Sequence, residues 1–556
     1  MKSRFNFKYL LGLILILCLI NFGASSIFKR FDFTEDQRYT LSETSLEITS
    51  KIKKPVVIQV FLKGDLPSGF SRLQRETRYI LEEFSAYNSN IKFEFVDPVG
   101  KNETAIEVGT RFYENGMPPE NLNIREKGRT TETLIFPWAT AKYGNKTSKI
   151  PLLQKTLDQN NEETIKKSIQ NLEYAFADAF TKLTRERNKK IAIIKGQGEL
   201  DDRYISDFLQ TIKDYYLIAP FTLDSVEVSP QKTLDVLKTY DLIIDAKPRQ
   251  EFSENKKYAL DQYLMNGGKS LWLIEHTIAE KDSLYNQSQQ TFAIPNDLNL
   301  HGFFFKYGFR INPVLINDLY SAPIVLASGR GNNTQLKRFP WFYEPLGVSA
   351  DHPITENIKQ VKFDFANQID TLKSEIDKTV LLESSELSRK VGTPRIINLD
   401  IISQQPDPRL YTEGKYNLAV LLEGKFESAY KNKVKPFEIE NHLDKSEPTQ
   451  QVVVADGDVI KNQIQSGKAL ELGFDRYTGL TYGNKTFLLN TVNYLLGDQG
   501  LVEVRNKSIS LNKLDANKIQ AQALRWQIIN LGVSVLMLIG IGVLLNYLKR
   551  KRYQIN

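Results

Sequence analysis

Two long uncharged stretches, one near each end of the chain, restrict what this sequence can fold into more than any other feature. The first covers the 20 residues between Lys8 and Lys29, and the second covers the 23 residues between Arg525 and Lys549. An α-helix rises about 1.5 Å per residue, so each stretch can cross a hydrocarbon layer of about 30 Å. The sequence therefore predicts an N-terminal transmembrane anchor over residues 1–30, a transmembrane helix over 525–548 and a basic cytoplasmic tail over 549–556.

Basic residues gather at the two ends of the chain, and their positions predict its orientation. The formal charge is +7, of which residues 1–30 carry +5 and the C-terminal tail carries +4, so the rest is slightly acidic. The positive-inside rule places such basic ends in the cytoplasm, which leaves the bulk of the chain in a periplasm-like compartment outside the cytoplasmic membrane. A slightly acidic body has no basic footprint for phosphates, so we expect no nucleic acid partner.

The first stretch has a second interpretation. A basic start, a short apolar core and the small residues at positions 23–26 also match a cleaved signal peptide. Cys18 follows Leu17, where lipoprotein processing needs a small side chain, so we do not expect a lipid-modified cysteine. The residue pattern leaves both an anchor and a cleaved signal open.

The chain contains 1 Cys and 4 His among 556 residues, with 41% hydrophobic residues. Its length indicates several domains with sizeable cores. The Cys and His supply is too small for a disulfide framework or a Cys-based metal site, and a multi-His cluster would have to pool residues that are distant in the sequence. We therefore expect no cofactor and no metal site.

The first exported region, residues 31–155, has the pattern of a β-α-β unit followed by a strand pair. Residues 55–62 form a β-branched apolar run, a helical stretch follows, and residues 91–96 alternate as a strand. This order predicts a thioredoxin-like module. Because the region lacks a CxxC sequence, we expect it to bind or dock and not to perform thiol chemistry.

Residues 156–189 contain the clearest helical pattern of the chain. Six apolar residues share one stripe at helical spacing: Ile165, Ile169, Leu172, Phe176, Phe180 and Leu183. The opposite face is mixed in charge, which favours a packing face over a membrane-surface face. We predict a helix here that links two domains.

Strands and helices alternate over residues 190–300, which is typical of a parallel sheet with right-handed crossovers. We predict a Rossmann-like domain of flavodoxin or amidotransferase type, followed by a further α/β or α+β region over 301–524. The fold class is therefore α/β, membrane-anchored and multidomain. Ligands of parallel sheets bind at the carboxyl ends of strands. Those ends carry the residues of 195–199, Ala246-Lys247 and Glu275.

The most suggestive chemical motif is Gly196-Gln197-Gly198 after a strand, but the third glycine of a dinucleotide fingerprint would fall at Asp201, so a tight turn is favoured. The best carboxylates for acid–base or cation chemistry are Glu199, Asp456 and Asp458. Asp456 and Asp458 also fit a turn whose side chains cap backbone N–H groups. We predict no catalytic residues. The weak candidates for ligand binding are Gly196, Gln197, Gly198, Glu199, Asp456 and Asp458.

Five short strings carry a family resemblance: Arg38-Tyr39-Thr40-Leu41-Ser42, Phe61-Leu62-Lys63-Gly64-Asp65-Leu66-Pro67, Gly196-Gln197-Gly198-Glu199, Val454-Ala455-Asp456-Gly457-Asp458 and Tyr482-Gly483-Asn484-Lys485. With them, nearly the whole chain resembles the gliding-motility-associated ABC transporter substrate-binding (auxiliary) proteins of Bacteroidetes. Members often have His at the second place of the Gly-x-Gly-Glu string, where this chain has Gln197. That departure argues against acid–base chemistry at this string.

The resemblance implies a non-catalytic accessory subunit at the bacterial cytoplasmic membrane, with its bulk in the periplasm and both termini in the cytoplasm. The implied partners are an ABC permease, a separate ATPase, the membrane and other cell-envelope motility proteins. Two alternatives stay open. One is an extracytoplasmic hydrolase that uses Glu199 or the Asp456/Asp458 pair, and the other is a purely structural link in the motility apparatus.

Overall fold

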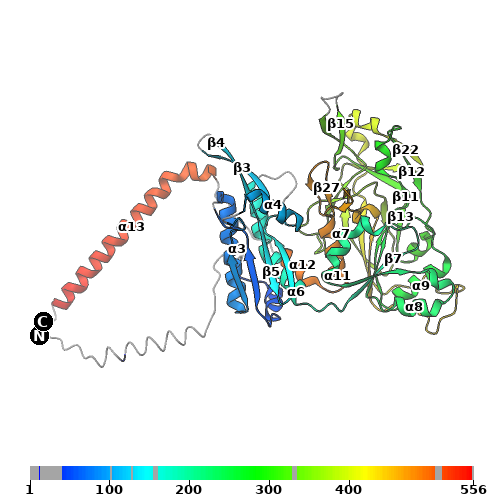
Figure 1. Cartoon of the computed structure of the whole chain (residues 1–556), viewed down its shortest axis with the longest axis horizontal. Helices are drawn as coiled ribbons and strands as arrows, with labels where there is room; N and C mark the ends of the chain where they lie inside the picture. The colour runs from blue at the N-terminus through cyan, green and yellow to red at the C-terminus, as the bar shows by residue number, and fades with distance from the viewer. Residues whose placement is uncertain are drawn as a thin grey trace. The chain divides into compact units, whose positions relative to one another are not determined.

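The computed structural model describes residues 12, 40–64, 66–100, 103–126, 129–154, 161–328, 335–506 and 516–553. It confirms the predicted mixed α/β class, with sheets that include parallel strands (Figure 1). Apart from Gly12, the predicted N-terminal anchor lies outside the described residues. The chain divides into two compact units, Met1–Lys507 and Ser508–Asn556.

The N-terminal part of the first unit contains a sheet of order β2-β1-β5-β6. Strand β1 runs parallel to β2 and antiparallel to β5, and helix α3 connects β1 to β2, so the predicted β-α-β unit is present. Burial alternates along β1 because one face of the strand packs on helices while the other faces outward. The elements are α2 (Glu43–Ser50), β1 (Val56–Val60), α3 (Ser68–Tyr87), β2 (Ile91–Phe95), α4 (Ala105–Glu114), β3 (Glu120–Glu126), β4 (Arg129–Ile135), β5 (Trp138–Tyr143) and β6 (Lys146–Pro151).

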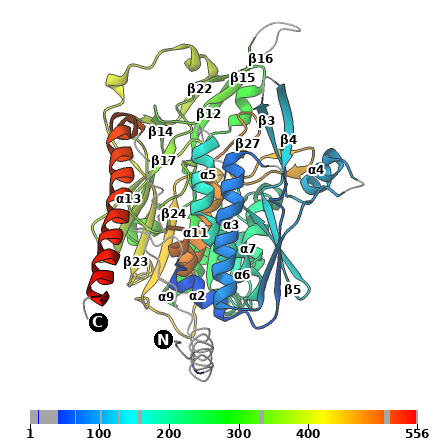
Figure 2. The ribbon, with the colours of Figure 1, turned by 90° about the vertical axis from the view of Figure 1, so that its left-hand side faces the viewer.

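The helical pattern of residues 156–189 forms two helices, α5 (Asn161–Gln170) and α6 (Leu172–Thr184), which meet at Asn171. All six residues of the predicted stripe are buried in the N-terminal core, where α3 lies beside α5 (Figure 2). Tyr174 and Ala177 of α6 belong instead to the core of the second sheet. Helix α6 therefore joins the two cores by burying residues in both.

The second sheet has the order β18-β17-β20-β23-β24-β10-β9-β7-β8, with β13 and β19 attached beside β23. Strands β8, β7, β9, β10 and β24 are parallel, and from β24 to β18 each pair is antiparallel. Numbered along the chain, the parallel strands run 2-1-3-4-5. The order reverses between β7 and β9, which is the switch point where parallel sheets usually bind ligands. The parallel strands are β7 (Lys190–Lys195), β8 (Leu217–Thr222), β9 (Leu242–Ala246), β10 (Lys269–Leu273) and β24 (Thr449–Val454).

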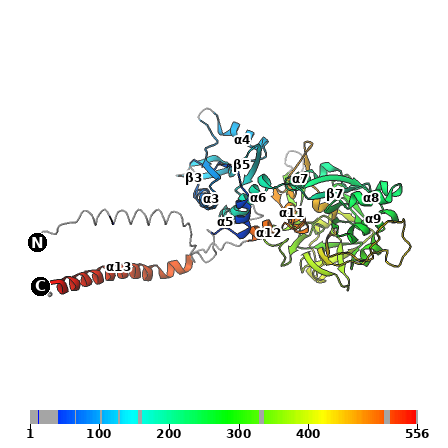
Figure 3. The same ribbon diagram turned by 90° about the horizontal axis from the view of Figure 1, so that it is seen from below.

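Both faces of this sheet are covered, which is why its strands are continuous apolar runs. Helices α7 and α11 pack on one face, and α9 and α10 pack on the other. Figure 3 shows α8 beside α9. The bounds are α7 (Asp202–Lys213), α8 (Pro230–Leu237), α9 (Glu254–Met265), α10 (His301–Lys306), α11 (Asn484–Leu495) and α12 (Gln499–Asn506).

The sheet runs across residue 300, where the sequence analysis places a domain boundary. Strand β24 pairs directly with β10, so Ser270 lies opposite Gln451 and Leu273 opposite Val454. The apolar strand β24 needs a neighbour on each side, and it finds β10 and β23. The antiparallel strands of this sheet are β13 (Phe309–Asn312), β17 (Leu346–Ser349), β18 (Val361–Lys362), β19 (Gln368–Thr371), β20 (Asp377–Glu383) and β23 (Asn417–Gly424).

Much of the chain between β10 and β23 forms a smaller layer with its own apolar core around Leu315, Trp341 and Val391. This stretch is a long insertion that separates β24 from β10 in the sequence. For that reason the sequence does not indicate that β24 belongs to the same sheet as the earlier strands. Its strands are β11 (Thr277–Ile278), β12 (Gln290–Pro295), β14 (Val314–Asp318), β15 (Ile324–Ser328), β16 (Gln335–Phe339), β21 (Ser388–Gly392) and β22 (Arg395–Asn398). Short strands after β24 are β25 (Ile464–Gln465), β26 (Lys468–Ala469), β27 (Phe474–Asp475) and β28 (Leu480–Thr481).

The second unit contains α13 (Ala516–Tyr553), a single continuous helix. Its segment Leu524–Lys551 has 28 residues and contains an 18-residue window with a mean hydropathy of 2.6, and it includes the predicted span 525–548. Within the described part of the chain, this is the helix that is long and apolar enough to cross a membrane. Its large apolar side chains, such as Leu531 and Leu538, are exposed, as lipid contact requires.

Candidate functional site

The carboxyl ends of β7, β9, β10 and β24 hold every candidate residue from the sequence analysis. The structure arranges these residues in two groups. The charge of Glu199 acts on Asp245, the last polar residue of β9, while Asp456 and Asp458 meet Glu275, which follows β10. The candidate residues therefore lie at the same edge of the parallel sheet. Whether a carboxylate there can bind a ligand or transfer a proton depends on the groups that surround it.

The Gly196-Gln197-Gly198 string forms a tight turn. Gly196 and Gly198 have φ values of +107° and +77°, which glycine adopts without strain. The buried Gln197 accepts hydrogen bonds at its carbonyl oxygen from the N–H groups of Arg249 and Gln250, both at 2.8 Å. Its own N–H donates to Glu199 Oε2 at 2.9 Å. Because the Gln197 N–H is bonded to Glu199 and the N–H groups of Arg249 and Gln250 are bonded to Gln197, these groups do not form a cradle for a phosphate.

Asp245 is a buried carboxylate that the sequence analysis did not select. It is wholly buried, and neither of its oxygens has a hydrogen-bond partner in the described part of the chain. Burial and the neighbouring Glu199 raise the pKa of Asp245 well above its usual range. Burial also raises the pKa of Glu199. An acidic residue closing an apolar strand, as in Asp241–Asp245, was the signal that could have identified it.

Glu275, Asp456 and Asp458 offer carboxylate oxygens that all lie within 4.8 Å of one another, which is a spacing suited to a cation. That cation is supplied by the chain. Lys247 Nζ lies 3.0 Å from Glu275 Oε1 and 2.5 Å from Asp458 Oδ2, and the Lys247 side chain is only 2% exposed. These residues therefore fit a buried lysine and not a metal ion.

Further charges complete this buried network. Arg249 Nη1 lies 3.3 Å from Glu275 Oε2, and Lys461 Nζ lies 3.4 Å from Asp458 Oδ1. Although burial alone would raise it, the pKa of Asp458 is held well below its usual range by Lys247 and Lys461. Burial outweighs the cations at Glu275 and raises its pKa to about 7. The result is a set of mutually paired charges with little access to water.

Asp456 has a structural role that matches the capping interpretation. Its Oδ1 accepts the N–H of Asp458 at 2.7 Å, and its Oδ2 accepts the N–H of Asp364 at 2.6 Å. Asp458 does not cap but forms ion pairs. Gly457 between them passes so close to Lys247 that a Cβ at this position would lie 2.4 Å from Lys247 Cβ. Lys247 itself has a φ of +62°, an uncommon value for a residue with a side chain.

A second buried charge group adjoins the first through Asp364. Glu344 is wholly buried and pairs with Lys281 and with Lys362, whose Nζ lies 3.2 Å away. Burial and the charge of Glu344 raise the pKa of Asp364 to about 6. Lys281 begins a short 3-10 helix, Glu344 lies in a loop and Lys362 ends the short strand β18. They share no local motif, so the sequence gives no signal that they would meet.

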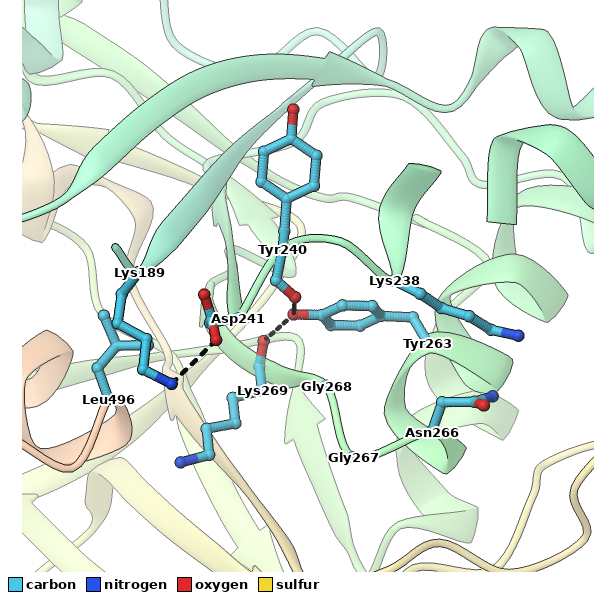
Figure 4. Close-up of a pocket in the computed structure, with 10 residues that line it drawn as sticks. All are labelled: Lys189, Lys238, Tyr240, Asp241, Tyr263, Asn266, Gly267, Gly268, Lys269 and Leu496. Carbon is cyan, nitrogen blue, oxygen red and sulfur yellow. Dashed lines mark hydrogen bonds and ion pairs between the residues drawn. The ribbon is translucent and has the colours of Figure 1, made fainter. Parts of the chain in front are cut away.

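The opposite, amino end of the sheet carries a pocket of about 300 Å³ (Figure 4). In it, Lys189 Nζ lies 3.1 Å from Asp241 Oδ1, and the Tyr263 hydroxyl lies 3.2 Å from the carbonyl oxygens of Tyr240 and Lys269. Figure 4 shows the amino groups of Lys189 and Lys238 on opposite sides of the Tyr263 hydroxyl. Lys189 and Lys238 therefore do not converge on one ligand position.

Comparisons with known proteins show limited similarity outside the family matches. The chain is 23% identical over 428 residues to an uncharacterized protein of Borreliella burgdorferi, which covers 76% of this chain and 77% of that protein. The solved structure titled mmIFT52 N-terminal domain covers 55% of this chain and 97% of its own at 11% identity, with a TM-score of 0.33. A cold-adapted β-galactosidase from Rahnella sp. R3 covers 68% of this chain and 66% of its own at 10% identity, with a TM-score of 0.20. Both TM-scores are too low to indicate a shared fold.

Two family models match the first unit. One, a domain of unknown function, matches residues 35–142. The other, described as ABC-type uncharacterized transport system, matches residues 188–491 and so spans the second sheet and its covering helices. This match covers more than half of the chain and confirms the predicted resemblance at the level of ABC transport auxiliary proteins. The chain belongs to the family of uncharacterized ABC-type transport system auxiliary proteins.

Proposed function

We propose that this protein is a non-catalytic, membrane-anchored accessory subunit that works with an ABC permease and a separate ATPase. The observation that carries the proposal is the family match over residues 188–491. Helix α13 supplies an apolar segment of sufficient length for the anchor. In this arrangement the energy of transport comes from the ATPase, and the first unit contributes binding or docking surfaces.

The orientation follows from charge. Lys549 to Arg552 form a basic end directly after the apolar segment of α13, and basic residues also precede the first uncharged stretch. Under the positive-inside rule both ends lie in the cytoplasm, and the first unit lies in the periplasm. The resemblance to gliding-motility-associated proteins points to a transport system that serves motility across surfaces.

The N-terminal sheet supports a docking role. Its order β2-β1-β5-β6, with β5 antiparallel to β1, fits a thioredoxin-like module. The sequence between residues 31 and 155 contains no cysteine, so thiol exchange is not available to it. A module of this kind contributes surface and shape, which suits contact with a permease or a cell-envelope partner.

The geometry of the carboxyl end supports the non-catalytic part of the proposal. A hydrolase needs a carboxylate that can reach both water and substrate. Asp245 and Asp456 are wholly buried, Glu275 is 2% exposed, and Asp458 is engaged by Lys247 and Lys461. The switch point between β7 and β9 is likewise filled by the chain, since Gln197 and Lys247 are each 1% exposed.

Co-purification of the full chain from native membranes tests the accessory role. We expect the permease and the ATPase to be recovered with it. The control is a variant in which residues 526–548 are replaced by an unrelated apolar span of equal length, which separates contact through the span from contact through the periplasmic unit. Recovery of neither transport component with the unmodified chain would contradict the proposal.

Topology and catalysis are tested separately. A reporter fused at residue 300 should report a periplasmic location, and a cytoplasmic signal would overturn the orientation. The hydrolase alternative is tested with Glu199→Gln. A hydrolytic activity of the full chain that is lost in this variant, with the unfolding temperature unchanged, would favour the enzyme over the accessory subunit.

A further inference from the structure

A cavity of about 610 Å³, which we call the junction cavity, lies within the first compact unit where one end of the first sheet meets the amino end of the second. From the first sheet, it is lined by Lys54, which precedes β1, and by Tyr143 and Lys146 beside the turn between β5 and β6. From the second sheet, it is lined by Leu217, the first residue of β8. Residues 183–187, at and after the end of α6, connect the two sides. A cavity of this volume at a junction of two cores is typical of sites for small molecules.

Positive charge dominates the lining of the junction cavity. Four cations line it together with the carboxylate of Glu186, and the cations are Lys54, Lys146, Arg185 and Arg187. Asp498 Oδ2 lies 2.7 Å from Arg185 Nη1, whereas the other three cations have no ion-pair partner in the part of the chain that the structure describes. A concave site lined mainly by one sign of charge attracts ions of the opposite sign.

Neutral oxygens orient two of the unpaired cations. Lys146 Nζ donates to the carbonyl oxygen of Leu183 at 3.4 Å, and Arg187 Nη1 donates to the carbonyl oxygen of Lys213 at 2.8 Å. A carbonyl oxygen accepts a hydrogen bond without cancelling the positive charge, and the Arg187 guanidinium has further N–H groups to donate. The chain therefore holds these cations in place but leaves them without a carboxylate partner.

The junction cavity also has apolar walls. Leu217 is 44% exposed, so much of its side chain is available to a ligand. Leu183 belongs to the N-terminal core, and Tyr143 packs against the same core. The turn beside them is tight, because Tyr143 lies directly opposite Lys146 and Gly144 between them has a φ of +58°. A fixed apolar surface therefore lies beside the cations.

We propose that the junction cavity binds a small organic anion with an apolar body and one carboxylate, sulfonate or phosphate group. Lys54, Lys146 and Arg187 hold the charged group, because ammonium and guanidinium groups form strong charge-assisted hydrogen bonds with such oxygens. Tyr143 and Leu217 contact the apolar body. The site goes beyond the accessory role, since it assigns a ligand class and a position to this chain without reference to the permease or the ATPase.

The position of the site predicts a second effect of the ligand. Helix α6 buries residues in both cores, and the junction cavity lies at its carboxyl-terminal end. A ligand that contacts Lys146 on one side and Leu217 on the other joins the two cores. Because a ligand that binds only the folded state stabilises it, the bound anion should raise the unfolding temperature of the chain.

The test uses the full chain in a nonionic detergent and a benzophenone carboxylate, which is a photoreactive aromatic anion. The corresponding benzophenone carboxamide is the uncharged control probe, and titration of detergent alone corrects for binding to micelles. Calorimetric titration should show tighter binding of the carboxylate than of the carboxamide. After irradiation, mass spectrometry should find the carboxylate label on peptides that contain residues 143–146 or 183–187.

Paired variants locate the charge contacts. Lys54→Gln and Arg187→Gln alter exposed cations of the cavity, and each should weaken binding of the carboxylate by roughly tenfold. Lys53→Gln is the matched control, because Lys53 is also exposed and adjoins Lys54 but lies outside the residues that line the cavity, so the affinity should not change. Leu217→Ala removes apolar contact and should weaken binding by about fivefold.

Competition identifies the source of the anion. Soluble naphthoate should displace the benzophenone carboxylate, and stronger displacement by phosphatidylglycerol added to the micelles would assign the site to an anionic lipid headgroup. Unfolding temperatures of the variants without probe show whether a loss of binding reflects a loss of fold.

The proposal is overturned if the carboxylate binds no more tightly than the carboxamide, or if Lys54→Gln and Arg187→Gln both bind it as tightly as the unmodified chain. It is also overturned if naphthoate does not displace the probe, or if the label is found only outside the residues that line the junction cavity. These results are independent of co-purification with transport components, so either proposal can fail alone.

Discussion

The carboxyl and amino ends of the parallel strands each carry a lysine–aspartate ion pair, and the two ion pairs differ in how deeply they are buried. At the carboxyl end, Lys247 pairs with Asp458, and the two side chains are 2% and 8% exposed. At the amino end, Lys189 pairs with Asp241, and the side chains are 43% and 33% exposed. Parallel sheets usually bind ligands at the carboxyl end, yet here that end is filled and the amino end is open to solvent.

This contrast shows that position in a fold does not by itself make a binding site. A buried ion pair is costly to assemble, and once assembled it strongly resists the removal of one partner. A half-exposed ion pair is cheap to assemble and contributes little. The ion pairs at the carboxyl end of the parallel sheet therefore hold the ends of β7, β9, β10 and β24 together. A ligand that bound there would have to displace paired charges.

The largest expected effect in this comparison is that of Lys247→Met. Methionine approximates the length of lysine but leaves Glu275 and Asp458 buried without their central cation. We expect the free energy of unfolding to fall by about 3–5 kcal/mol, the usual result of removing one partner from a buried pair. Chemical denaturation of the full chain in detergent measures this change.

The double variant Lys247→Met with Asp458→Asn sharpens that prediction. Removing the charge of Asp458 together with that of Lys247 should recover part of the lost stability, because fewer uncompensated charges remain buried. A loss below about 1 kcal/mol for Lys247→Met, which is the range of exposed ion pairs, would mean that the carboxyl end is not the rigid network described.

The backbone around Lys247 gives the second prediction. A Cβ at Gly457 would lie 2.4 Å from Lys247 Cβ, so Gly457→Ala must push the two segments apart. Overpacking of this kind typically costs about 1–3 kcal/mol, and thermal unfolding should show it. Gly302→Ala in α10 is the control, since its Cβ would meet no atom within 4 Å. Equal melting temperatures for Gly457→Ala and the unmodified chain would contradict the close approach.

The third prediction concerns pH. Burial raises the pKa of Glu275 to about 7, from an ordinary value near 4.5 in the unfolded chain. Between these values the folded state binds more protons, so the contribution of this group to stability is full below pH 4.5 and is lost as the pH rises through 7. The stability of the unmodified chain relative to Glu275→Gln should therefore decrease from pH 4.5 to pH 7.5.

Denaturation midpoints of both proteins, taken at several pH values, measure that difference in stability. His276 and Asp364 also have shifted pKa values, but they are present in both proteins, and their contributions cancel in the comparison. Glu386→Gln is the control for the removal of one carboxylate, because the Glu386 side chain is 82% exposed. A constant or rising difference for Glu275→Gln would show that the Glu275 carboxylate is already ionised at low pH.

The sequence predicted the parts of this molecule that follow from periodicity and strand order. Apolar runs such as Asp241–Asp245 identified strands of the parallel sheet, whose shared carboxyl edge carries residues 195–199, Lys247 and Glu275. The capping role of Asp456 was among the interpretations. The joining of β24 to β10 was not foreseen, because a long insertion separates them.

The partners of the site residues could not be predicted, because they depend on side-chain packing between distant segments. Lys247 was placed at a strand end, but nothing in its neighbourhood indicated that it would fill the acidic group. Glu344 and Lys362 lie in a region with little periodicity, and their ion pair arises only when loops fold over the sheet. His276 and His301 likewise carry no spacing motif, and their ring contact depends on the insertion.

The smallest expected effect is at the open end of the sheet. Lys189→Met removes the ion pair with Asp241, but Asp241 Oδ2 keeps the N–H of Lys190 at 2.8 Å, and solvent screens what charge remains. We expect a loss of about 0.2–1 kcal/mol, measured by the same denaturation as for Lys247→Met. Lys238→Met, whose amino group points away from this pair in Figure 4, should have a still smaller effect. Lys189 and Asp241 precede the adjacent strands β7 and β9, whereas Lys247 and Asp458 follow β9 and β24, which have β10 between them. Lys247 also pairs with Glu275, so the ratio of the two losses reports burial together with the number of charges that the lysine pairs with. If Lys189→Met cost as much as Lys247→Met, exposure would not explain the difference between the two ends, and the amino end would have to be regarded as a second structural centre.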